Sequence, residues 1–217
     1  MNYSVAARRK RAKIILRELK KLFPKAGMML NFSNHWELVV AVSLSAQCTD
    51  KKVNEVTAKL FKKYPRLEDY VQADVLEFER DIFQTGFYHQ KARNALAAAR
   101  VLTEKFNGVV PATMEELREL PGVGRKTANV VLGNAFGTAV GIAVDTHVGR
   151  LARVFGLTRE TSPEKIERDL MRIIPQNEWF QTTYRFIEYG RTFCTARRHD
   201  HERCPLTVML AELTHVT

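Results

Sequence analysis

Apolar residues recur at helical spacing through nearly the whole chain, and this periodicity limits the folds that it can adopt. In the segment from Tyr3 to Phe23 the apolar stripe consists of Ile15, Leu16, Leu19, Leu22 and Phe23. Basic residues surround this stripe and Pro24 ends it, which is typical of an amphipathic helix. Because no useful length of chain alternates apolar and polar residues as a strand does, the sequence predicts an all-α fold.

Turn signals divide the remainder into further predicted helices. Glycine, proline and an Asn-Gly pair end them, and Thr113 with Glu116 has the spacing of a capping box. The predicted helices cover about residues 36–46, 51–63, 73–82, 90–106, 113–120, 124–136, 146–155, 163–174 and 179–191. The 217 residues suffice for one large or two small domains.

The chain is strongly basic. Lys and Arg number 34 against 24 Asp and Glu, which gives a net charge of +10. Such a surplus points to a polyanionic partner, although a basic surface without a function is the alternative. The apolar runs fall far short of the roughly 20 residues that a membrane span needs. Three cysteines are too few for a disulfide framework, so we expect a reducing cytoplasm.

The most informative segment runs from Leu120 to Ala128 and reads Leu-Pro-Gly-Val-Gly-Arg-Lys-Thr-Ala. Gly122 and Gly124 allow a tight turn between two helices and a close approach to the backbone. The second helix then offers unpaired N–H groups and the positive end of its dipole to an anion, here a DNA phosphate. The alternative is a helical hairpin whose glycines only make the turn.

This segment resembles the helix-hairpin-helix motif of a superfamily of DNA glycosylases, in which Lys126 occupies the position of the nucleophile. Val144–His147 resembles the segment with the superfamily's aspartate, here Asp145. The chain is identified as similar to the endonuclease III family over about residues 31–204. Four further segments resemble that family in the same order, namely Leu44–Asp50, Thr85–Ala92, Asn107–Pro111 and Gly190–Cys194.

The resemblance implies two helical domains flanking a DNA-binding cleft. A six-helix barrel with the hairpin would comprise residues 28–138, and a second domain residues 1–27 and 139–217. It implies a monomeric glycosylase and abasic-site lyase for oxidised pyrimidines in double-stranded DNA, in the nucleoid-associated cytoplasm of a prokaryote. A relative with another lesion specificity and a non-catalytic DNA-binding module are the alternatives. An adenine-excising relative would need a glutamate around Val42, which is absent.

The chemistry of the two residue types fits this activity. A lysine amine attacks the sugar C1′ only when neutral, so its pKa must fall from about 10.4. For Lys126 the helix N-terminus and the neighbouring Arg125 act in that direction. Loss of the base builds positive charge on the sugar, which the carboxylate of Asp145 can stabilise. The alternatives are a solvated lysine and a plain helix cap.

A flipped base leaves a gap in the duplex, and the resemblance assigns its filling to Gln47 and the Phe87-Tyr88 loop. Phe87 could equally be a core residue. His147 is expected either to reach a phosphate or simply to lie in a first helical turn. The residues expected to bind DNA are therefore Gly122, Val123, Gly124, Arg125, Thr127, Gln47, Phe87, Tyr88 and His147. The basic run Arg197, Arg198, His199 and His201 is either a further backbone contact or a solvated face.

Many members of the family hold an iron-sulfur cluster on four cysteines near the C-terminus. In this chain that pattern falls on Cys194, His201, Cys204 and Leu210, so only Cys194 and Cys204 are cysteines. We therefore expect no cofactor and no metal, and an apolar cap formed by the tail after Cys204. Zinc held by Cys194, His201, Cys204 and His199 is the alternative. Cys48 is expected to be a small buried apolar residue, and a reactive thiol beside Gln47 is the alternative.

Overall fold

The computed structural model describes residues 4–197 and 199–215, with side chains as far as residue 211. These residues are helical or in turns, and the described ranges contain no strand, which confirms the predicted all-α class. No helix in them is long and apolar enough to cross a membrane. The chain divides into a central unit, residues 29–140, and a terminal unit, residues 1–28 with 141–217. The six-helix barrel stays a prediction.

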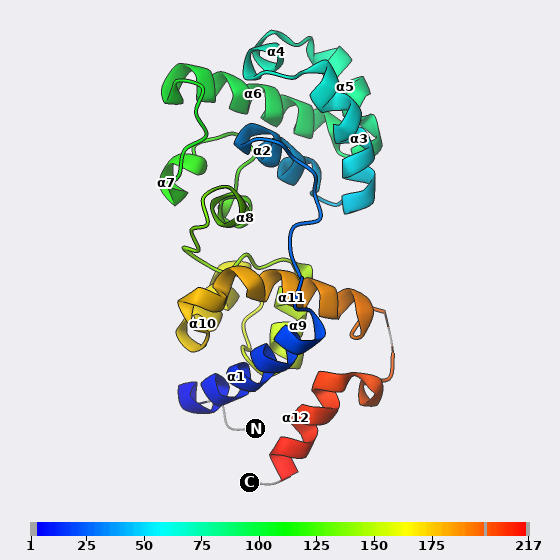
Figure 1. Cartoon of the computed structure of the whole chain (residues 1–217), viewed down its shortest axis with the longest axis vertical. Helices are drawn as coiled ribbons and strands as arrows, with labels where there is room; N and C mark the ends of the chain where they lie inside the picture. The colour runs from blue at the N-terminus through cyan, green and yellow to red at the C-terminus, as the bar shows by residue number, and fades with distance from the viewer. Residues whose placement is uncertain (1–3, 198, 216–217) are drawn as a thin grey trace. The chain divides into compact units, whose positions relative to one another are not determined.

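The central unit is organised around α2 (His35–Leu44). Seven of the ten residues of α2 are buried, because its Leu-Val-Val-Ala-Val run is apolar on every side. The other helices of this unit are α3 (Asp50–Lys63), α4 (Leu67–Gln72), α5 (Val75–Ile82), η1 (Phe83–Thr85), α6 (Tyr88–Phe106), α7 (Met114–Leu117) and α8 (Arg125–Ala135). In Figure 1, α6 runs along the side of α2, and α8 lies beyond its other side.

Three aromatic side chains pack together in the core of the central unit. The ring of Tyr70 packs edge-on against Trp36 at 5.2 Å and against Phe78 at 5.7 Å between centroids. Tyr70 lies in α4, a helix that the periodicity did not predict because six residues are too few to show a repeat. Asp69 caps the start of this helix, since its carboxylate accepts a hydrogen bond from the backbone N–H of the N-cap residue Arg66 at 2.8 Å.

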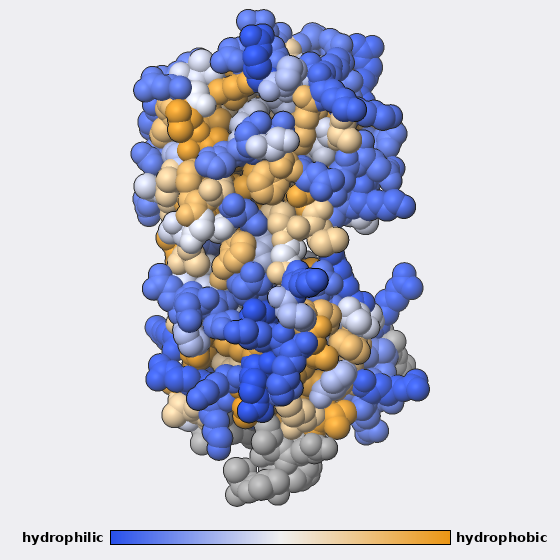
Figure 2. Space-filling model, viewed as in Figure 1, coloured by the Kyte–Doolittle hydropathy of each residue, from blue (hydrophilic) through white to orange (hydrophobic). Residues whose placement is uncertain are grey.

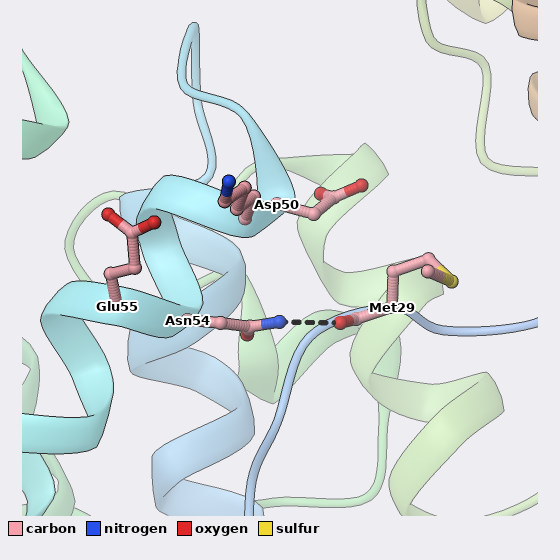
Figure 3. Close-up of a pocket in the computed structure, with 5 residues that line it drawn as sticks. Met29, Asp50, Asn54 and Glu55 are labelled. Atoms are coloured by element: carbon pink, nitrogen blue, oxygen red, sulfur yellow. Dashed lines mark hydrogen bonds between the residues drawn. The ribbon is translucent and has the colours of Figure 1, made fainter.

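Asn54 fixes the segment that leads into the central unit. Its amide Nδ2 donates to the Met29 carbonyl at 2.8 Å, and its Oδ1 accepts from the Asn31 N–H at 2.9 Å. Figure 3 shows the first of these bonds beside a shallow pocket of about 480 Å³. Lining that pocket are Met29, Asp50, Lys51, Asn54 and Glu55. None of the expected site residues is among them.

The terminal unit packs helices from both ends of the chain. Its helices are α1 (Val5–Leu22), α9 (Thr146–Val154), α10 (Pro163–Ile173), η2 (Gln176–Glu178), α11 (Trp179–Thr192), η3 (His201–Arg203) and α12 (Pro205–His215). The stripe predicted in α1 is buried at Ile15, Leu16 and Leu19. Pro163 opens α10, where a missing N–H costs nothing. Figure 2 shows hydrophilic residues over α1 and much of α3 in this view.

A charged contact joins the two ends of the terminal unit. The Arg8 guanidinium lies 3.1 Å from the Asp169 carboxylate and donates to the Leu157 carbonyl at 3.0 Å. The same carboxylate accepts a hydrogen bond from Thr158 Oγ1 at 2.6 Å. Because these groups are mostly shielded from water, they hold α1 on α10 more strongly than a surface ion pair does.

Candidate functional site

The predicted hairpin lies between α7 and α8 of the central unit. Gly122 has a φ of +81°, which L side chains rarely adopt. A Cβ at this position would lie 2.7 Å from Nδ2 and 2.9 Å from Cβ of Asn94, which belongs to α6. Glycine is therefore required twice at position 122, for the backbone conformation and for the close approach of α6.

Gly124 has a different role. It is the N-cap of α8 with a φ of −84°, and a Cβ added to it would meet no atom within 4 Å. No side chain of the cap residue bonds to the first N–H groups of α8. The fold itself therefore does not need glycine at position 124, and the backbone there is open to an approaching group.

The remaining hairpin residues differ in what they offer to a ligand. Val123 is buried, with 5% of its surface exposed, and its backbone N–H donates to the Leu120 carbonyl at 3.0 Å, so it offers little surface to a ligand. Arg125 and Thr127 are half-buried, whereas Lys126 is exposed in the first turn of α8. Within the described part of the chain, no ion pair or hydrogen bond holds the Lys126 amine.

Two further expected residues lie in left-handed turns of the central unit. Gln47 has a φ of +54° and Phe87 a φ of +49°, conformations that cost a residue other than glycine about 1 to 3 kcal/mol each. Gln47 is exposed, and 67% of the Phe87 surface is exposed, so the alternative of a core residue is wrong for Phe87. The Tyr88 ring is half-buried and packs against Phe83 at 5.0 Å.

Sequence reasoning missed Lys91, which lies beneath both turns. Its amine donates to the carbonyls of Leu44 at 2.9 Å and Thr85 at 2.8 Å. Burial lowers the pKa of Lys91, and the nearby Cys48 partly opposes this. The helical pattern contained no signal for it, because a lysine in a predicted helix usually faces solvent.

Asp145 is the N-cap of α9 in the terminal unit. Its Oδ1 accepts a hydrogen bond from the Val148 N–H at 2.8 Å, so the predicted N-cap is confirmed. The residues before it, Ile142 to Val144, are buried, and Thr183 Oγ1 donates to the Ala143 carbonyl at 3.1 Å. These two hydrogen bonds fix the position of the half-buried Asp145 carboxylate.

His147 lies in the first turn of α9, held closely by α11. A Cβ at Gly190 would lie 2.5 Å from His147 Nδ1 and 3.3 Å from Arg150 Nη2, so α9 and α11 meet at a point where only glycine fits. Arg150 in turn donates to the Cys194 carbonyl at 2.5 Å and approaches its Sγ at 3.4 Å. The helix that begins at Asp145 is thus tied to Cys194.

The expectation that this chain has no cofactor or metal site is wrong. Cys194, His199, His201 and Cys204 come together, and one ligand atom from each lies within 4.8 Å of all the others. Cys204 Sγ is 3.3 Å from His199 Nε2, and Cys194 Sγ is 3.8 Å from His201 Nδ1. These are the four residues of the alternative, a zinc site. Two cysteines of the family pattern are absent, but the fold brings two imidazoles to the two remaining thiols.

This four-residue cluster fits a metal centre. Thiolates and imidazoles are the ligands of zinc, and imidazoles also replace two thiolates in some iron-sulfur centres. Both cysteines are buried, and burial, followed by the neighbouring Cys194, raises the pKa of Cys204 to about 11. A bound metal ion must therefore displace a proton from this thiol.

The tail is arranged around the same cluster. Leu206 in α12 is buried, and Met209 and Leu210 pack partly against the core of the terminal unit. The Leu206 N–H donates to the Tyr189 hydroxyl at 3.0 Å. The expected apolar tail therefore packs beside the metal-binding cluster and does not replace it.

Three further residues of the sequence analysis remain, namely Arg197, Arg198 and Cys48. Arg197 is exposed, and Arg198 lies outside the described residues. Cys48 is half-buried, so the expectation of a buried apolar residue is wrong. It lies between two exposed residues, Gln47 and Thr49, just before α3.

A model of the HhH-GPD superfamily of base excision DNA repair proteins matches residues 40–176. The endonuclease III of Synechocystis sp. is 48% identical over 202 residues, which cover 93% of this chain and 92% of that protein. The endonuclease III of Bacillus subtilis is 44% identical over 204 residues, which cover 94% of this chain and 93% of that protein.

Two solved structures are similar in fold. A non-covalent endonuclease III–DNA complex has a TM-score of 0.89 and 43% sequence identity, covering 95% of this chain and 98% of that one. A trapped covalent endonuclease III–DNA intermediate has a TM-score of 0.87 and 46% identity, covering 91% and 93%.

The two hairpin glycines make a matched test of this geometry. We expect Gly122→Ala to destabilise the central unit by roughly 2 to 4 kcal/mol, because it adds a left-handed alanine and a clash with Asn94. For Gly124→Ala we expect less than about 1 kcal/mol, since a poorer cap is offset by a less flexible unfolded chain. Urea unfolding measures both, and equal losses would contradict the assigned roles.

Proposed function

Because the chain belongs to the HhH-GPD superfamily of base excision DNA repair proteins, we propose that it excises damaged bases from duplex DNA and cleaves the resulting abasic sites. The observation that carries this proposal is the exposed Lys126 amine, which follows an open glycine turn at the start of α8. The likeness to endonuclease III over more than nine-tenths of the chain supports it. Oxidised pyrimidines are the proposed substrates, and the cytoplasm of a bacterium is the proposed location.

In this proposal the hairpin binds a phosphate of the DNA backbone. The N–H groups of the first turn of α8 and its dipole attract the anion, and the open space at Gly124 admits it. Gly122 keeps the turn in place from behind, against Asn94. Contacts of this kind position the protein on the duplex without reading its sequence.

Lys126 is the proposed nucleophile. Its neutral amine attacks C1′ of the damaged nucleotide, and the base leaves with the electron pair of the glycosidic bond. The departing base takes up the proton that the amine loses. The C1′–O4′ bond then breaks, O4′ takes a proton from water, and an iminium ion forms between Lys126 Nζ and C1′. Removal of a proton from C2′ then expels the 3′ phosphate by β-elimination, and water releases the lysine.

Asp145 is the proposed electrostatic partner of this reaction. Its carboxylate would stabilise the positive charge that develops on the sugar as the base departs. The N-cap bond to Val148 occupies Oδ1 and orients the group. Gln47, Phe87 and Tyr88 are the proposed residues that fill the space of the flipped base, and His147 is a proposed phosphate contact.

We also propose that the metal-binding cluster holds a single metal ion. Around one tetrahedral ion with metal–sulfur bonds near 2.3 Å and metal–nitrogen bonds near 2.0 Å, ligand atoms lie about 3.3 to 3.8 Å apart. The thiol–imidazole separations of 3.3 and 3.8 Å fall in this range, and all four ligand atoms lie within 4.8 Å of one another. The donor set departs from the four thiolates of the family pattern, and zinc suits it best. Through Arg150, the ion would steady α9 and Asp145.

The lyase chemistry is tested by borohydride trapping on abasic DNA. We expect a covalent complex with the wild type, because hydride reduces the iminium, and none with Lys126→Ala. Lys165→Ala is the control, since Lys165 is also exposed in the first turn of a helix, α10. Trapping in Lys126→Ala, or a wild type that is never trapped, would refute the assignment.

Asp145→Asn separates the charge from the helix cap. Asparagine caps helices as well as aspartate does, so we expect the stability to change by a few tenths of a kcal/mol at most. Base excision should fall on the order of a hundredfold or more, because the stabilising charge is gone. Single-turnover excision on a lesion-containing duplex measures this, with unfolding as the check. Undiminished excision would show that the carboxylate has no catalytic part.

Elemental analysis of the purified protein tests the metal site. We expect about one zinc ion per chain, lost in Cys194→Ser and in His199→Ala with a lower unfolding temperature, because metal ligation contributes directly to folding. Cys48→Ser is the control and should keep the ion. A metal-free wild type would contradict the site, and iron with acid-labile sulfide would contradict the single ion.

A further inference from the structure

We propose that Lys91 is a positioning residue that holds the Gln47 and Phe87 turns in one fixed arrangement for DNA. This inference rests on the proposed function, because it assumes that these two turns enter the gap left by a flipped base. Because Lys91 is buried, its side chain would hold the two turns without contacting the DNA or the reacting atoms.

The two hydrogen bonds of the Lys91 amine carry the proposal. Its two acceptors are the carbonyls of Leu44, the last residue of α2, and Thr85, the last residue of η1. Gln47 follows Leu44 by three residues, and Phe87 follows Thr85 by two. One ammonium group therefore joins the ends of two helices immediately before each left-handed residue.

The electrostatics of helix ends explain why a lysine suits this place. The last carbonyls of a helix have no partner within it and form the negative end of its dipole, so they attract a cation. Lysine supplies three donors on a flexible stem and can serve two such ends at once. Lys91 itself lies in the first turn of α6, which begins directly after Phe87. One residue of α6 thus holds the segments that lead into both turns.

The burial of Lys91 supports a specific role. Only 7% of its surface is exposed, and burying an amine is costly unless its hydrogen bonds are made. A residue that merely filled this space could be apolar, whereas this chain places an amine here, and burial lowers the pKa of that amine. The bonds to the two carbonyls offset that cost. The turns that they hold are exposed and, at Gln47 and Phe87, in a strained backbone conformation.

Lys91→Met tests the inference, because methionine keeps an unbranched apolar stem and removes the donors. The readout is the ratio of affinities for a duplex with a tetrahydrofuran abasic analogue and for the same duplex undamaged. We expect this ratio to fall about tenfold or more, as expected for the loss of hydrogen bonds from a charged group. Affinity for the undamaged duplex should stay unchanged, since phosphate contacts dominate it.

Two controls separate positioning from general stability. Leu102→Ala removes a fully buried side chain from the same helix, and Lys105→Met removes an exposed lysine from it. We expect both to leave the ratio unchanged, although Leu102→Ala destabilises the unit. Hydrogen exchange should show faster amide exchange at residues 45–48 and 86–88 in Lys91→Met, and not in either control.

A further comparison measures the coupling itself. Phe87→Ala should lower the affinity ratio in the wild type and have a much smaller effect in the Lys91→Met background, because the turn is no longer held. An unchanged ratio and unchanged exchange in Lys91→Met would overturn the inference. If the wild type itself failed to prefer the abasic duplex, the proposed function would fail, whereas the exchange result would still report on the role of Lys91.

Discussion

The contact between Gly122 and Asn94 decides where the proposed nucleophile stands. Because α6 approaches the turn so closely, position 122 cannot carry a side chain, and the left-handed backbone there directs the chain into α8. Lys126 follows within one turn of that helix. Gly124, two residues earlier, is unconstrained by the fold. Packing on one side of the turn therefore leaves the other side free for a ligand, which is how a rigid scaffold presents backbone N–H groups.

In the terminal unit, other contacts hold the proposed catalytic carboxylate of Asp145 in position. Asp145 is oriented by its own cap bond, and α9 behind it is held by the glycine contact at position 190 and by Arg150. Arg150 ends on Cys194, which belongs to the metal-binding cluster. A metal ion there would therefore stabilise the helix that carries the carboxylate without taking part in the reaction. Outer contacts of this type often decide how well a catalytic group is aligned.

Lys91 and the metal-binding cluster show what charge and ligation contribute once a helical core exists. Apolar burial forms the two cores but is not directional. Directed bonds are needed wherever an irregular segment must hold one conformation, as at the turns of Gln47 and Phe87. Polar groups that the fold removes from water make these directed bonds. Their hydrogen bonds are stronger there than in water, and removing one partner leaves the other buried and unpaired at a large cost in free energy.

Local chemistry in the sequence determined the helical class, the stripe of α1, the hairpin and the cap at Asp145, because periodicity, glycine and N-caps act over a few residues. Tertiary structure alone decided that Phe87 is exposed, that Lys91 is buried and that two histidines join two cysteines. The burial of Lys91 depends on a distant segment, α2, whereas the four-residue cluster depends on how the segment between α11 and α12 folds back on itself. The sequence pattern likewise did not predict the short helix α4, because the burial of Tyr70 against other helices stabilises it more than its own six residues do.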